Sequence, residues 1–257
     1  MQSSQEEKYN KIFNYLVYTL IILILISLIH GYSCKYLTRS ICKDINFLNN
    51  FLQENGFIEN IQSLALLVSI IIFLSLIKLT KIEKIIQIFI YLKILALIYY
   101  FGEEISWGQH FFKWNTPELF NEINNQKETN LHNISNLLDQ LPRSLVVLWC
   151  GFIPIIFYFL KKKINFKSHL NLIILPKTKL LVVSIIFLFF FFPDFIVDKA
   201  NLHPGWHVDG QDIKEAKIFD TFTFNFVERL SEIHELIFCF YFLIYSISFK
   251  QAIKDYY

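Results

Sequence analysis

The chain has 257 residues, of which 54% are hydrophobic and only 18% are charged. A soluble domain carries about 25% charged residues and has no repeated long apolar runs. The composition therefore excludes an ordinary soluble domain and indicates a helical membrane protein. The formal net charge of +2 says nothing about nucleic acid. The sequence has no basic, aromatic-rich groove, so we expect no nucleic acid partner.

Apolar runs recur along the whole sequence, and each is close to the roughly 20 residues that a helix needs to cross a ~30 Å hydrocarbon core. They predict six membrane spans, at about 12–29, 57–77, 85–101, 145–160, 180–197 and 230–249. The first run could be a cleaved signal peptide, but it exceeds a signal core of roughly 7–15 residues, so we expect a retained helix. Pro193 is expected to kink the fifth span near its end. The predicted fold class is all-α: one polytopic membrane helix bundle over residues 1–257, with short interfacial helices on the outer side.

Basic residues indicate the orientation of this bundle. The short loop 78–84 contains three Lys, and the loop 161–179 contains six. The long connections contain ten Lys and Arg spread over 30–56, 102–144 and 198–229. Short basic loops are the ones retained in the cytoplasm, so we expect both termini to be cytoplasmic in a bacterial inner membrane. Residues 102–144 and 198–229 then form an outer cap.

The four cysteines do not form a framework. Cys150 and Cys239 fall inside apolar runs, where a thiol usually packs as a small apolar group. Cys34 and Cys42 share one connection and could pair if it faces an oxidising compartment.

Acidic residues and histidines lie mainly on the predicted outer side. Of the 22 acidic residues, 18 fall within 44–59, 102–139 and 194–235. Six of the seven histidines lie on the same side. A polar site that opens towards the outer leaflet is therefore expected.

The end of the third span carries two adjacent carboxylates, Glu103 and Glu104, followed by Trp107. A charge at membrane depth costs free energy and is a functional-site hypothesis by default. The simpler alternative is that these acids only solvate the end of a helix. Helical periodicity places four residues on one stripe of this span: Lys93, Tyr100, Glu104 and Trp107. Lys93 is mid-span, so we expect it to face the bundle interior, towards an acid such as Glu104, Asp194 or Glu235.

The last span begins with three acids on one face, Glu228, Glu232 and Glu235. Acids are stabilised at a helix N-terminus by the dipole, which explains Glu228 without a site. Several carboxylates meeting in low dielectric need compensation. The compensation could be a bound metal, shared protons, or the basic side chains of Arg229 and Lys93.

The outer connection after the third span is expected to be ordered. Thr116 reads as an N-cap, followed by a proline at the first helical position. Leu119, Phe120 and Ile123 then form an apolar stripe suited to lying on the membrane surface. Residues 130–141 could form a second short helix.

Histidines of the outer cap are candidate metal ligands, with zinc as the expected ion. The candidates are His110, His132, His203 and His207. His203 and His207 have a spacing that metal sites use on helices, but the Pro-Gly pair between them makes a helix unexpected. Asn130 and Asn133 suit binding of sugar hydroxyls or head groups, and suit helix capping equally well.

These patterns lead to one main hypothesis, a metal-assisted hydrolase or transferase acting on a membrane lipid or lipid-linked substrate, with Glu103 or Glu104 as general base. The other candidate catalytic acids are Asp194, Glu232 and Glu235. The candidate substrate-binding residues are Lys93, Tyr100, Trp107, Asn130, Asn133 and Arg229. Two alternatives stay open: an ion- or proton-coupled carrier or binding protein, and a membrane assembly or scaffold protein.

Three sequence blocks carry a resemblance: Gly102-Glu-Glu-Ile-Ser-Trp-Gly-Gln109, Thr116-Pro-Glu118 and Glu128-Thr-Asn-Leu-His-Asn133. They resemble a group of uncharacterised bacterial multi-pass membrane proteins, in which a similar block closes one membrane helix and acids open the last one. The resemblance implies a polytopic inner-membrane protein and implies no particular activity.

Overall fold

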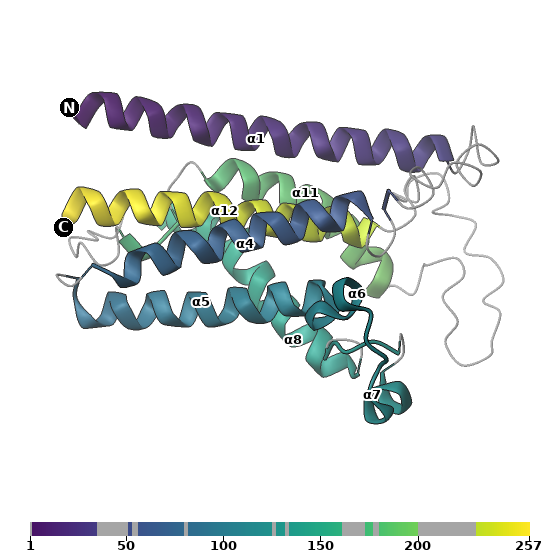
Figure 1. The fold of residues 1–257 in the computed structure, drawn as a ribbon. Helices are drawn as coiled ribbons and strands as arrows, with labels where there is room; N and C mark the ends of the chain where they lie inside the picture. Colours follow the sequence, from purple (N-terminus) through teal and green to yellow (C-terminus); the bar gives the residue numbers. More distant parts are fainter. Residues whose placement is uncertain are drawn as a thin grey trace.

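The computed structural model describes residues 2–34, 51–52, 56–79, 82–124, 127–131, 134–160, 173–176, 180–199 and 230–257. Regular secondary structure in these ranges is helical throughout (Figure 1). The long helices are α1 (Gln2–Tyr32), α4 (Phe57–Ile77), α5 (Lys84–Glu104), α11 (Leu180–Lys199) and α12 (Leu230–Tyr256). A further rod joins α8 (Asn136–Val147), a π-helical turn (Leu148–Phe152) and α9 (Ile153–Leu160).

Among the described residues, five segments are long and apolar enough to cross a membrane: Tyr9–Tyr32, Phe57–Ile77, Lys84–Glu104, Leu141–Leu160 and Glu232–Tyr256. The remaining predicted span, the fifth, corresponds to α11, whose apolar part covers Leu180–Phe192. The predicted all-α membrane helix bundle is therefore confirmed. Helices are expected in these segments because a membrane offers no water to satisfy backbone groups, and a helix satisfies them internally.

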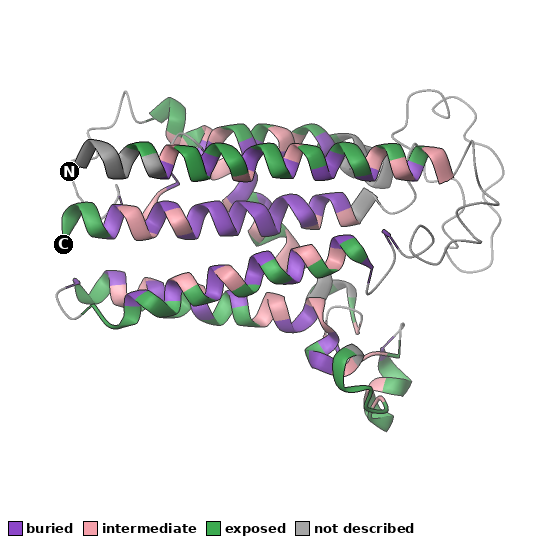
Figure 2. Cartoon of the chain, turned by 45° about the horizontal axis from the view of Figure 1, so that its top comes forward, coloured by how far each residue is buried: buried purple, intermediate pink, exposed green. Residues whose placement is uncertain are grey.

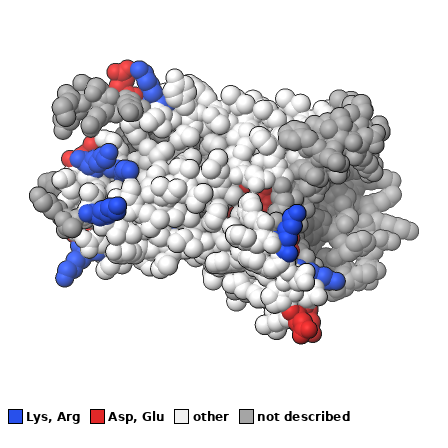
Figure 3. Space-filling model, viewed as in Figure 1, with Lys and Arg blue, Asp and Glu red and all other residues white. Residues whose placement is uncertain are grey.

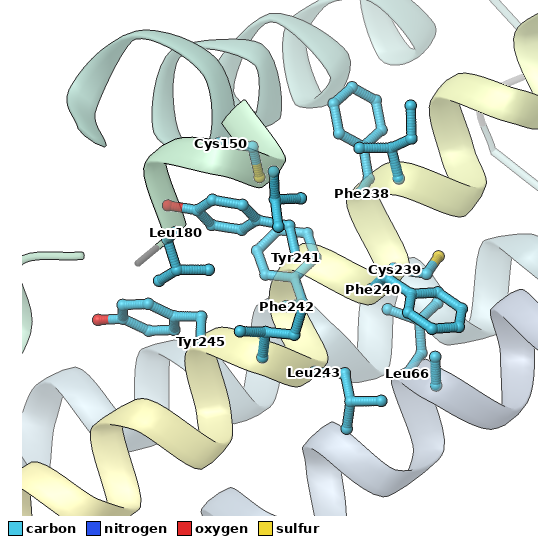
Figure 4. Packing of buried hydrophobic residues seen from close by; sticks show 14 of the residues in the cluster. Leu66, Cys150, Leu180, Phe238, Cys239, Phe240, Tyr241, Phe242, Leu243 and Tyr245 are labelled. Atoms are coloured by element: carbon cyan, nitrogen blue, oxygen red, sulfur yellow. The ribbon is translucent and has the colours of Figure 1, made fainter. Parts of the chain in front are cut away.

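Helix α12 is the centre of the bundle. It packs against α4, α11 and α1, and Figure 2 shows buried residues along most of its length. A helix that is apolar on all sides is stable when other helices surround it. Figure 4 shows aromatic side chains of α12, including Tyr241 and Tyr245, lying near Cys150 and Leu180 of neighbouring segments.

The chain termini lie at one end of the bundle, together with the turn between α4 and α5 (Figure 1). The opposite end holds the C-terminus of α5 and the N-terminus of α12. Beyond α5 the chain forms a short 3-10 turn (Ser106–Gly108), α6 (Gln109–Phe112) and α7 (Glu118–Ile123). Residues 105–124 and 127–131 are called the α6–α7 segment below.

The π-helical turn in the fourth span follows from Pro154. Proline has no N–H, so backbone carbonyls one turn earlier lose their usual donor. The side chains of two other helices replace that donor: Ser184 Oγ donates to the Cys150 carbonyl at 2.5 Å, and Tyr241 Oη donates to the Trp149 carbonyl at 3.3 Å. The irregular backbone is thereby satisfied inside the protein, as a membrane requires.

Gly151 allows this turn to pack closely on α11. A Cβ atom at position 151 would lie 2.9 Å from a methyl group of Leu188 and 3.1 Å from the ring of Phe187. Either approach is shorter than an ordinary carbon–carbon contact, so a larger residue would push the two helices apart.

Two local predictions differ from the structure. The expected short helix at 130–141 is instead the start of α8, which begins at Asn136 and continues into the fourth span. Helix α11 runs through Pro193 to Lys199, and its side chains from Pro193 onward lie outside the described residues. The kink at Pro193 stays a prediction.

Candidate functional site

The adjacent acids at the end of α5 have different surroundings. Glu103 is only 5% exposed. Its Oε1 accepts a hydrogen bond from Trp107 Nε1 at 2.8 Å, and its Oε2 accepts one from the Leu131 backbone N–H at 2.7 Å. Both carboxylate oxygens are therefore engaged in fastening the α6–α7 segment to α5.

Trp107 covers the end of α5. Ser106 and Trp107 have positive φ values of 46° and 53°, which reverse the chain direction and return the indole towards the helix. A Cβ atom at Gly102 would lie 2.9 Å from three atoms of the indole ring, so only glycine leaves room for it. Tyr99 contacts the same ring edge-on, with centroids 6.4 Å apart.

The sequence blocks that carry the resemblance bond to one another. Glu128 Oε2 accepts hydrogen bonds from Ser106 Oγ at 2.6 Å and from Asn130 Nδ2 at 2.9 Å. Asn124 Nδ2 donates to the side chain and to the backbone carbonyl of Asn130, both at 2.8 Å. Asn130 is therefore buried in a hydrogen-bond network within the segment, and these side-chain hydrogen bonds stabilise the fold of the segment.

A second set of bonds closes the loop between α6 and α7. Gln109 Oε1 accepts from the N–H and the hydroxyl of Thr129, and Gln109 Nε2 donates to Thr116 Oγ1 at 2.7 Å. The Thr116 hydroxyl donates to the Lys127 carbonyl at 2.6 Å. Thr116 was expected to cap α7, but Pro117 occupies the cap position and no side-chain cap bond forms.

Glu104 projects from a different face of α5, about 100° around the helix from Glu103, and is half-buried. Three further carboxylates are within electrostatic range of it: Glu59, Glu232 and Glu235. Arg143 of α8 is also in range, and its Nη2 lies 3.4 Å from Glu235 Oε1. Within the described part of the chain, Glu104 itself has no hydrogen-bond or ion-pair partner. We call these five residues the acidic cluster. Figure 3 shows partly covered acidic atoms close to basic atoms on this face of the bundle.

The acidic cluster joins four helices, because Glu59 belongs to α4, Glu104 to α5, Arg143 to α8 and the other two acids to α12. Gln62 of α4 lies one turn below Glu59 and is fully buried. Its Nε2 donates to the Glu232 carbonyl at 2.8 Å, whereas its Oε1 has no partner among the described residues. A buried acceptor without a hydrogen-bond donor costs free energy. The space beside Gln62 Oε1 therefore favours a group that can donate a hydrogen bond.

Below the acidic cluster, α5 and α12 face each other along the predicted stripe. Tyr100 hydrogen-bonds to Cys239, a buried free thiol, and its ring contacts Phe242 edge-on at 6.3 Å. Tyr100 therefore lies between the acidic cluster and the middle of the membrane.

Lys93 lies inside the bundle among aromatic rings. Its Nζ is 3.8 Å from the centroid of the Trp149 ring and between 5.3 and 5.9 Å from the rings of Phe89, Tyr245 and Phe242. The described residues include no ion-pair partner for Lys93. Among the described residues, aromatic faces surround Lys93 where Glu104 or Glu235 was expected, and the side chain of Asp194 lies outside them.

The histidine candidates fall largely outside the described residues. His132, Asn133, His203, His207 and Arg229 lie there entirely, and so do the side chains of His110 on α6 and Asp194 on α11. Within the described ranges, no group of three His, Cys, Asp or Glu could hold a metal ion. His234 of α12 is buried between the rings of Phe187 and Phe191.

Two members of the acidic cluster were not among the predicted site residues. The sequence does give a signal for Glu59: it lies three residues before Gln62, so the two polar residues share one face of an apolar span. Arg143 carries no comparable sequence signal, because only the tertiary packing of α8 brings it to Glu235.

No family model, curated protein or solved structure matches the chain. The fold and the acidic cluster therefore define the class of protein directly: an all-α, multi-pass membrane protein with several carboxylates gathered at one end of the bundle.

Proposed function

We propose that the acidic cluster binds a proton or another cation and that the protein is an ion- or proton-coupled carrier or binding protein. The observation that carries this proposal is the state of Glu104. Glu104 is a half-buried residue, has no hydrogen-bond or ion-pair partner among the described residues, and lies near three other carboxylates.

The physical argument is electrostatic. Like charges in a partly buried site repel more strongly than in water because the local dielectric is lower. A bound proton or cation removes that repulsion, and ionisable residues with such surroundings in membrane helices are typical of ion pathways and proton relays. Arg143 lies at Glu235, so Glu104 is the acid where this compensation is needed most.

Infrared spectroscopy of the reconstituted protein tests this proposal. We expect the carbonyl band of a protonated carboxyl group at neutral pH, or carboxylate bands that shift on adding Na⁺. The first result identifies the proton as the bound species and the second identifies a cation. Either feature should disappear in Glu104→Gln and persist in Glu118→Gln, an exposed acid of α7. Wild-type protein with neither feature would contradict the proposal.

Metal-assisted hydrolysis or transfer on a lipid or lipid-linked substrate stays a prediction. The side chains of its candidate metal ligands, His110, His132, His203 and His207, lie outside the described residues. The assignment of Glu103 as general base is now the weaker choice, because both of its oxygens already accept hydrogen bonds. Glu104 is the acid that suits such a role.

We propose that the termini face the cytoplasm of a bacterial inner membrane. Basic side chains gather at the end of the bundle that holds the termini (Figure 3); those of the described helices and loops there include Lys11, Lys78, Lys84, Lys250 and Lys254. This distribution agrees with the positive-inside rule. Cys34, at the opposite end of α1, is disulfide-bonded, which suits an oxidising compartment.

Reporter fusions test this orientation. Green fluorescent protein fused after Tyr257 is expected to fluoresce, and alkaline phosphatase fused there to be inactive. Fusions after Lys113, in the α6–α7 segment, should give the reverse pattern. Active phosphatase at Tyr257 would show that the orientation is inverted.

A further inference from the structure

The α6–α7 segment exposes several large apolar side chains. Phe112 is 77% exposed and Leu119 63% exposed. Phe111, Trp114 and Ile123 are also exposed, and the rings of Phe112 and Trp114 stack with centroids 5.8 Å apart. An exposed apolar patch of this kind marks an interaction surface rather than a surface in contact with water.

Helix α7 separates its apolar and acidic residues. Glu118 and Glu122 are four residues apart and share one face, and Leu119 and Ile123 share another about 100° around the helix. This division is typical of a helix that lies at a boundary between water and an apolar phase.

The position of the segment identifies that apolar phase. Figures 1 and 2 both show α7 displaced sideways, beyond the flank of α5 and away from the axis of the bundle. The flank of α5 exposes Leu92, Leu95 and Ile98, as a lipid-facing surface does. Tyr99 continues this surface to Trp107, so the apolar patch is an extension of the lipid-facing flank.

We propose that the α6–α7 segment lies in the head-group and acyl boundary of the adjacent bilayer leaflet, with its aromatic and aliphatic side chains inserted in lipid. Tryptophan and aromatic side chains favour this zone because their rings are amphipathic. Lys113 and Lys127 are exposed on the same segment and can contact lipid phosphates, whereas Glu118 and Glu122 face water. A protein partner would need no such continuity with the lipid-facing flank of α5.

The hydrogen bonds of Glu103 and Gln109 hold the segment in one place relative to α5. The apolar face is therefore presented at a fixed depth, at the level where the span of α5 ends. The segment therefore sets how deeply the acidic end of the bundle lies in the membrane.

Spin labelling of the full chain in phosphatidylcholine–phosphatidylglycerol nanodiscs tests this placement. Single cysteines are introduced at Glu118, Leu119, Glu122 and Ile123 in a background where Cys150 and Cys239 are replaced by alanine. For each label, the collision rate with oxygen is divided by the collision rate with a water-soluble nickel complex. This ratio is expected to be several-fold higher for labels at 119 and 123 than for labels at 118 and 122. The four positions form matched pairs on one helix, so a general loss of structure would affect all of them alike.

Two results would overturn the proposal. Equal access of the nickel complex to all four labels would place α7 in water. Labels at 119 and 123 shielded from both reagents would show that protein, either a partner or a second copy, covers the face. Circular dichroism of each labelled variant verifies that the helices are intact.

Discussion

Glu103→Ala is expected to release the α6–α7 segment from the end of α5. The substitution removes the acceptor of both the Trp107 indole and the Leu131 N–H. Hydrogen bonds to a charged group contribute about 1.5–3 kcal/mol each, so the loss should reach about 3–5 kcal/mol for the local unfolding of this segment. Hydrogen exchange measured by mass spectrometry should show the amides of residues 105–131 exchanging faster, with the helices of the bundle unchanged.

Glu118→Ala is the matched control, because it removes an exposed acid from the same segment and should change its stability by less than about 0.5 kcal/mol. Glu103→Gln keeps one acceptor and should fall between the two. Unchanged exchange in Glu103→Ala would show that Glu103 does not fasten the segment.

Lys93→Glu is expected to destabilise the bundle by at least about 2 kcal/mol, the size of a desolvated cation–π interaction. A carboxylate at this depth would meet the negative faces of the rings that now surround the ammonium group, Trp149 above all. Thermal unfolding in nanodiscs measures the effect. Trp149 fluorescence should also change, because its ring loses the ammonium group 3.8 Å from its centroid.

Two controls distinguish the charge from its position. Lys84→Glu reverses an exposed charge at the start of the same helix and should leave the unfolding temperature nearly unchanged. Lys93→Met keeps the apolar stem of lysine and should be better tolerated than Lys93→Glu, since replacing a buried charge with an apolar group is often neutral. A Lys93→Glu variant as stable as Lys84→Glu would contradict a stabilising role for the aromatic surroundings.

The helices were predictable because apolar runs of membrane length have few alternative structures. The span predicted at 57–77 coincides with α4, and the others differ only at their ends. The stripe of Lys93, Tyr100 and Glu104 was also predictable, because helical periodicity depends on sequence spacing alone. Its orientation towards Phe242 and Cys239 of α12 is consistent with that spacing.

The division of roles between Glu103 and Glu104 could not be predicted. The two acids are adjacent and have the same chemistry, and only the fold of the α6–α7 segment determines which one is enclosed. Arg143 was missed for a related reason. Its ion pair with Glu235 spans 92 positions, and no local pattern encodes such a pairing.

The central place of α12 has a consequence for biogenesis. Tyr9 bonds to Ser248, Gln62 to the Glu232 carbonyl, and Tyr241 to the Trp149 carbonyl. In each pair, one group belongs to an earlier segment and the other belongs to α12. The ribosome makes α12 after the other segments described here. Membrane insertion of the earlier helices therefore leaves these polar groups without their native partners until α12 packs against α4, α11 and α1.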